Sequence, residues 1–219
     1  MSGKVMIMED NWAVEHLQTI RTLMERVALY RRTLSPVMFL TGIIGIIFAG
    51  CGVLLKLTTP PIFVVWWLAA GALAFGGALL ITRKQALKDK EPFWSGPTRR
   101  VVSSLIPPLY SGVAIGAAIA INQSIINPLA LVSLWVIIYG IALYSASFFM
   151  QRGMKLFGLL FVIAGGILLI ITAAFITRPD YLTAHYIMGL FFGLAHLSYG
   201  VYLRFTEKSL PEAQSSQKQ

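Results

Sequence analysis

The chain has 219 residues, of which 57% are apolar and only 12% charged, whereas an ordinary soluble domain carries about 25% charged residues. The apolar residues gather into runs of roughly 20, and at 1.5 Å per residue such a run crosses a hydrocarbon core about 30 Å thick. The net charge of +9 does not predict nucleic-acid binding, because the Lys and Arg residues lie between the apolar runs. The composition therefore predicts an all-α integral membrane helical bundle rather than a soluble domain.

An amphipathic pattern precedes the first apolar run. Apolar residues recur at steps of three and four, as a helix with one apolar face requires; they include Ala13, Leu17, Ile20, Met24 and Val27. The Ser35-Pro36 step suits a junction between two helices, since proline fits a first helical position. We expect residues 1–35 to form a cytoplasmic amphipathic helix that lies in the lipid interface, packs under the bundle, or binds a protein partner through residues 9–34.

Six apolar segments follow, and none of the nine Asp and Glu residues falls inside them. Their lengths predict a bundle of six transmembrane helices over 36–205, followed at 206–219 by a polar tail that we expect to be disordered. The segments are 36–55, 62–82, 101–121, 129–149, 156–176 and 182–203.

The third segment carries Pro107 and Pro108, which remove two amide donors and clash with the preceding turn. We predict a kinked span, with a re-entrant segment as the alternative. If the segment did not cross, Arg152 and Lys155 would move to the outer side, against the charge distribution of the other loops.

Basic residues are distributed unequally between alternate loops. Sixteen of the 18 Lys and Arg residues lie in the two terminal regions and in the second and fourth loops, and only Lys56 and Arg178 lie in the others. The positive-inside rule then places both termini and the two basic loops in the cytoplasm. Trp66 and Trp67 fall near the outer boundary, where we expect interfacial aromatic residues.

Small residues recur four apart on two of the spans, as Gly112 and Gly116 on the third and Gly189 and Gly193 on the sixth. Such surfaces let the backbones of neighbouring membrane helices approach closely. They predict helix packing inside the bundle, and the alternative is the contact face of a homodimer.

The sixth span places His185, Gly189, Gly193, His196 and Gly200 on one predicted helix face. Ionisable side chains at membrane depth are costly and point to function by default. His185 lies close to the predicted outer boundary, so His196 is the deeper of the two.

His196 has two interpretations: a structural, hydrogen-bonded residue, or a group that binds a ligand, a proton or a metal. We expect the neutral ring, because burial disfavours the charged form and the spans contain no carboxylate. Matching depths along the spans makes Ser111, Tyr139 and Ser145 its candidate partners.

No pattern in the chain predicts a cofactor, a metal centre or a catalytic site. Cys51 is the single cysteine, and the third histidine, His16, lies outside the bundle, so neither a multi-cysteine metal site nor a bis-histidine haem is expected. The sequence contains neither HExxH nor GxSxG, which are the spacings of common zinc and serine hydrolases. An enzymatic role is therefore not favoured.

Two segments carry a resemblance to known proteins. The stretch from His16 to Arg26, continuing to Tyr30-Arg-Arg32 and Pro36, and the stretch from Met188 to Gly200 resemble a family of uncharacterised small bacterial inner-membrane proteins. The resemblance covers both ends of the chain and implies no particular activity.

Our leading hypothesis is a non-enzymatic inner-membrane protein that acts as a scaffold, a sensor or the membrane partner of a cytoplasmic protein. The alternative is a small transporter or ligand-binding bundle with a cavity near His196, His185, Tyr139 and Ser111. An intramembrane enzyme or redox protein is the third class.

Overall fold

The computed structural model describes residues 33–90, 92–122, 127–150, 152–175 and 180–216. Across these residues the chain is helical and contains no strand, and six of its helices are long and apolar enough to cross a membrane. The predictions of an all-α fold and of six apolar helices are confirmed. Nearly all of the amphipathic helix expected over 1–35 lies outside the described residues.

The helices follow one another with short connections, and the sixth is built from three consecutive parts. We call Thr33–Leu54 the first helix, and we call α6, η2 and α7 together the sixth helix, whose apolar stretch is Tyr181–Thr206. The labelled elements are α2 Pro60–Lys88, α3 Gly96–Asn122, α4 Pro128–Ala146, the 3₁₀ turn η1 Ser147–Phe149, α5 Arg152–Phe175, α6 Tyr181–Met188, the π-helical segment η2 Gly189–Ala195 and α7 His196–Ser216.

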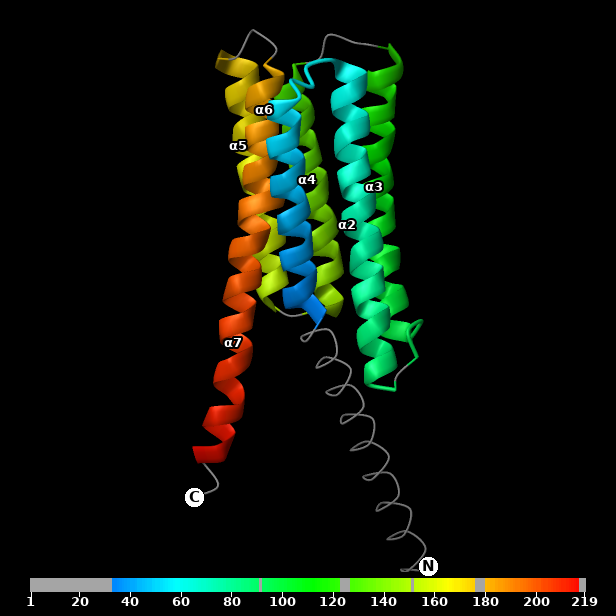
Figure 1. Ribbon diagram of the computed structural model, residues 1–219, viewed down its shortest axis with the longest axis vertical. Helices are drawn as coiled ribbons and strands as arrows, with labels where there is room; N and C mark the ends of the chain where they lie inside the picture. The colour runs from blue at the N-terminus through cyan, green and yellow to red at the C-terminus, as the bar shows by residue number, and fades with distance from the viewer. Residues whose placement is uncertain (1–32, 91, 123–126, 151, 176–179, 217–219) are drawn as a thin grey trace, which may run out of the picture.

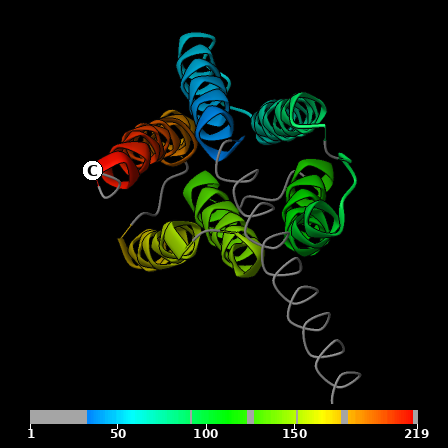
Figure 2. The same ribbon diagram turned by 90° about the horizontal axis from the view of Figure 1, so that it is seen from below.

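Helix α4 lies in the middle of the bundle, between α3 and α5 and in contact with α6 (Figure 2). Its backbone approaches that of α5 closely, because glycines occupy the crossing. A methyl group added at Gly140 would lie 2.7 Å from the amide nitrogen of Val162, and one at Gly158 would lie 2.7 Å from that of Tyr144. Only small residues permit such an approach.

The first helix packs against the sixth along another glycine-lined contact. A side chain at Gly42 would meet Leu197, and one at Gly193 would meet Ile46. Near one end, the hydroxyl of Ser35 donates to the carbonyl oxygen of Gly200 across 3.1 Å. The first helix begins and α7 ends at the same end of the bundle (Figure 1).

The start of the first helix and the end of α7 both differ from the sequence-based expectation. The expected junction at Ser35-Pro36 is part of a continuous helix from Thr33 onward, and Ser35 is buried against α7. Residues 206–219 were expected to be disordered, whereas α7 continues to Ser216. Glu, Lys, Leu, Ala and Gln make up six of the eleven residues 206–216 and favour the continuation, whereas Pro211 opposes it by removing one amide donor.

Helix α3 runs through Pro107 and Pro108 as one helix. Its 25 residues from Thr98 to Asn122 are long enough to cross a membrane, so the re-entrant alternative does not describe its shape. The hydroxyl of Ser111 donates to the carbonyl oxygen of Pro107 across 3.0 Å.

The turn after the first helix ends the helix in a defined way. The amide of Leu57 donates to the carbonyl of Gly52, and the amide of Lys56 donates to that of Val53. This pair of bonds is a Schellman motif, and Lys56 occupies its left-handed position with φ 51°. The motif fixes the direction of the Leu57 carbonyl, which matters for the site below.

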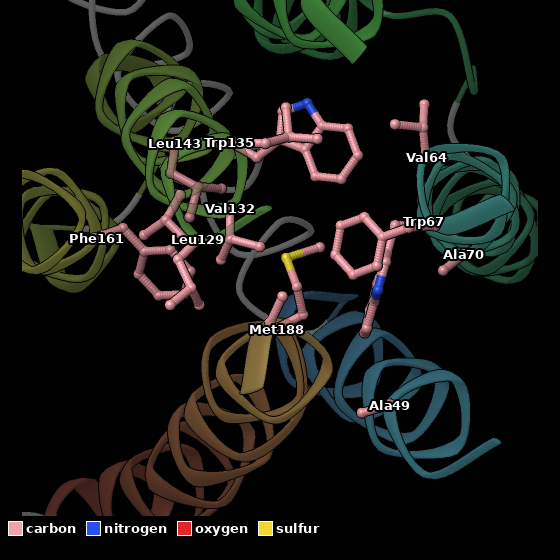
Figure 3. Close-up of a cluster of buried hydrophobic side chains, with 14 of the residues drawn as sticks. Ala49, Val64, Trp67, Ala70, Leu129, Val132, Trp135, Leu143, Phe161 and Met188 are labelled. Atoms are coloured by element: carbon pink, nitrogen blue, oxygen red, sulfur yellow. The ribbon is translucent and has the colours of Figure 1, made fainter. Parts of the chain in front are cut away.

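The core lies where α2, α4, α6 and the first helix converge. Figure 3 shows Trp67 of α2, Val132 of α4 and Met188 of α6 pointing toward one another. All three are buried, as is Ala49 of the first helix. This cluster surrounds the inner side of α6 and so helps to place His185.

Candidate functional site

His185 of α6 is bonded on both ring nitrogens. The indole Nε1–H of Trp67 donates to Nδ1 across 3.1 Å, and Nε2 lies 3.1 Å from the carbonyl oxygen of Leu57. An indole N–H only donates and a carbonyl oxygen only accepts, so Nδ1 is bare and Nε2 carries the proton. The two partners therefore fix His185 as a neutral ring in one tautomer.

The surroundings of His185 leave it no exposed surface. The ring of Phe63 packs edge-on at 4.9 Å between centroids, and Tyr181 packs edge-on against Phe63 in turn. A side chain at Gly52 of the first helix would overlap the His185 ring itself. His185 thus connects the first helix, the turn that follows it, and α2 to the sixth helix.

His196, the first residue of α7, is also bonded on both nitrogens. Nδ1 lies 2.9 Å from the carbonyl oxygen of Phe191, and Nε2 lies 2.8 Å from the hydroxyl of Tyr139 on α4. The carbonyl only accepts, so Nδ1 carries the proton, and in a neutral ring Nε2 accepts from the Tyr139 hydroxyl. The tautomer is the opposite of that at His185.

Four aromatic rings enclose His196. Phe157 and Phe161 of α5 pack edge-on at 5.2 and 5.5 Å between centroids, Phe192 stacks at 6.0 Å, and Tyr139 is tilted at 5.5 Å. The residue has no exposed surface. A buried polar ring costs free energy unless its nitrogens are bonded, and the two bonds meet that requirement.

The segment Gly189–Ala195 between the two histidines is π-helical. In a regular α-helix eleven residues make three turns and about 20°, so His196 would return to the face of His185. A π turn bonds residue i to i+5 and holds one residue more, which delays the rotation. The prediction that the two histidines share a face is wrong: His185 faces α2 and the first helix, whereas His196 faces α4 and α5.

The expected grouping of His196, Tyr139 and Ser111 is wrong as regards Ser111. Its side chain is exposed, and its hydroxyl is bonded to Pro107 on its own helix. Tyr139 does contact His196. Depth along a helix does not tell which way a side chain faces, and Ser111 faces away from the bundle interior.

The four glycines singled out in the sequence lie at helix contacts inside the bundle. Additions at Gly112 and Gly116 of α3 would meet Trp135 of α4, whose indole donates to the carbonyl of Gly112 across 2.9 Å. Gly189 faces the first helix at Ala49, and Gly193 faces the same helix.

Helix α6 begins at a well-formed cap. The Thr183 hydroxyl donates to the Asp180 carboxylate, which also accepts from the amides of Leu182 and Thr183 at 2.9 and 3.2 Å. These bonds, led by that of the hydroxyl, hold the pKa of the Asp180 carboxyl below its ordinary value of 3.8. The cap fixes the start of α6 one turn before His185.

Sequence reasoning missed the residues that hold the two histidines. Trp67 was assigned to the outer interface but is buried and donates to His185. Phe157 and Phe161 were not distinguished from lipid-facing residues. Their spacing of four on one helix, at the depth of His196, is the only signal in the sequence that points to them.

Among the described residues, no group of three His, Cys, Asp or Glu side chains is placed to hold a metal ion. The chain matches no protein-family model, and a comparison with curated proteins and solved structures finds no significant similarity to either.

Proposed function

We propose that the chain is a non-catalytic, multi-pass inner-membrane protein with both termini in the cytoplasm, serving as a scaffold, a sensor or the membrane partner of a cytoplasmic protein. The expected contact element is the segment 9–34. In this proposal the bundle supplies a rigid anchor, and the interaction takes place at its cytoplasmic surface.

One observation carries the proposal: all four ring nitrogens of the two buried histidines are bonded within the bundle. His185 and His196 have no exposed surface and are surrounded by aromatic rings. Ring nitrogens that are already bonded are not available to a ligand without rearrangement. The two histidines therefore support a structural role, which favours a partner protein over a transporter.

The distribution of charge supports the proposed orientation. The end of α2 and the starts of α3 and α5, whose sequences carry basic residues, lie at the end of the bundle where the first helix begins (Figure 1). Lys56 is the exception among the described residues, in the turn at the opposite end. By the positive-inside rule the basic end faces the cytoplasm.

Reporter fusions test the orientation. Fusions after Gln219 and after Asp89 should give cytoplasmic signals, and a fusion after Gln123 should give an external one. A cytoplasmic signal at Gln123 would remove the six-span arrangement, and with it the proposed placement of the termini.

Copurification tests the function. A soluble protein retained by the full chain should be lost on deleting residues 1–34 and kept by His196→Gln, which leaves the segment intact. If instead a small molecule raised the melting temperature of the full chain, and His196→Gln abolished that shift, a ligand-binding bundle would replace the proposal.

A further inference from the structure

The hairpin between α2 and α3 carries an unusual combination of side chains at its tip. Six cations lie between residues 83 and 100, and all six are exposed. Apolar side chains are exposed among them: Leu87 to 68% and Trp94 to 57%. The cations are Arg83, Lys84, Lys88, Lys90, Arg99 and Arg100.

The charge of this tip is not neutralised within the described residues. The sequence of 83–100 holds six cations against two acids, Asp89 and Glu91, which leaves an excess of four positive charges. The Asp89 carboxylate accepts from the side-chain amide of Gln85 across 3.0 Å rather than from a cation. Exposed cations that repel one another favour an anionic surface nearby. The tip therefore has the charge of a surface that docks to an anion.

The length of α2 places this tip beyond the apolar core. A helix of 29 residues is about 43 Å long at 1.5 Å per residue, against a hydrocarbon thickness of about 30 Å. Roughly the last nine residues of α2 then lie at the level of the head groups. Leu87 and Trp94 are exposed at this level, where an amphipathic side chain such as tryptophan is favoured.

The hairpin has limited support from the rest of the bundle. Only 17% of the apolar 18-residue stretch of α2, and the same share of that of α3, is buried inside the bundle, compared with 56% for α4. The two helices stand together at one side (Figure 2). Lipid that surrounds the two helices can therefore also contact the charged tip.

We propose that the tip of the α2–α3 hairpin is a docking surface for anionic phospholipid, with its cations on the lipid phosphates and Leu87 and Trp94 in the head-group layer. Phosphate oxygens accept hydrogen bonds from arginine in pairs, which suits the adjacent Arg99 and Arg100. A cation near an anionic membrane surface favours binding by roughly fivefold. The inference requires that the chain is inserted in a bilayer, but not that it has the proposed orientation or partner.

Quenching of Trp94 fluorescence tests the proposal. The full-length protein is reconstituted into vesicles of phosphatidylcholine and phosphatidylglycerol, with one or the other lipid brominated near the head-group end of its chains. Subtracting the signal of Trp94→Phe isolates the response of Trp94. Both leaflets hold the same lipids, so the direction of insertion does not affect the result.

We expect brominated phosphatidylglycerol to quench Trp94 several-fold more than brominated phosphatidylcholine. The preference should be lost in Arg99→Gln/Arg100→Gln and weaken in 1 M salt, where the screening length is about 3 Å. The matched control, Lys155→Gln/Arg204→Gln, removes two cations from the same end of the bundle on other helices and should leave the preference unchanged.

Three results would overturn the inference. Equal quenching by the two lipids would mean that the tip does not select anionic lipid. An equal loss in the control variant would mean that the whole end of the bundle attracts the lipid. Quenching by neither lipid would place the tip outside the head-group layer, free in water or against an acidic protein.

Discussion

The bond between Tyr139 and His196 can be removed with little change of shape. Tyr139→Phe deletes one oxygen and leaves the ring among Phe161 and Phe192. The Nε2 atom of His196 then has no donor in a site from which water is excluded. A hydrogen bond between membrane helices contributes about 0.6 kcal/mol on average, and an unpaired buried acceptor costs about 1 to 3. We expect a loss of about 1 kcal/mol.

Larger changes at His196 should cost more, in a defined order. His196→Ala removes both bonds and leaves a cavity between aromatic rings. Replacing a buried Phe by Ala costs about 3 to 5 kcal/mol, and the smaller imidazole should give about 3. His196→Gln keeps an amide that can donate or accept, so its loss should be about 1 to 2 kcal/mol. The order follows from the volume and the bonds that are lost.

The assay is reversible unfolding in mixed micelles titrated with dodecyl sulfate, which reports the free energy of unfolding. Tyr110→Phe is the control, because the Tyr110 ring is 72% exposed and should lose nothing measurable. The effects of Tyr139→Phe and His196→Gln should be less than additive, since they share one bond. Full additivity, or no loss for either residue compared with Tyr110→Phe, would refute the structural interpretation of His196.

Three further predictions concern the ends of the helices near His185. Gly52→Ala should displace the His185 ring and lower the melting temperature by several degrees. The control Gly50→Ala, whose added methyl group meets nothing within 4 Å, should leave the melting temperature unchanged. Equal effects of the two variants would contradict the contact between His185 and the first helix. Lys56→Gly should raise the free energy of unfolding by about 1 kcal/mol, measured by the same titration, because lysine is strained in the left-handed conformation. Asp180 has a lowered pKa in the fold, so its capping contribution should be present above about pH 4 and be lost as the pH falls through the folded value. The melting temperature of the unchanged protein should therefore fall more between pH 5 and pH 3 than that of Asp180→Ala. An equal fall in the two proteins would contradict this.

The number and positions of the apolar helices could be predicted, because they depend only on where apolar residues are concentrated along the chain. Runs of apolar residues report length and burial directly, so six helices were expected and six are found. Helix neighbours depend instead on which side of each helix faces inward. The close crossing of α4 and α5 at Gly140 and Gly158 was not predicted, because glycine is frequent throughout the chain and its spacing alone does not identify a partner.

In the site, too, the sequence indicates how deep a residue lies along its helix but not which way its side chain faces. Tyr139 was among the three candidates at the height of His196, and the structure places it there. Ser111 was another, and it faces away. The π segment could not be found from a period of 3.6 residues, because one additional residue in a turn changes the direction of every later side chain without changing the composition.

The contact between the first helix and the sixth has a consequence for synthesis. A membrane protein is inserted from its amino terminus, so the Gly42 and Gly45 face of the first helix emerges long before Gly193 and Leu197, against which it packs. Until the sixth helix is made, that face has only lipid or the insertion machinery to cover it. The glycine face of the first helix is therefore covered only when the sixth helix is inserted, and a truncated chain lacking the sixth helix would leave that face exposed to lipid.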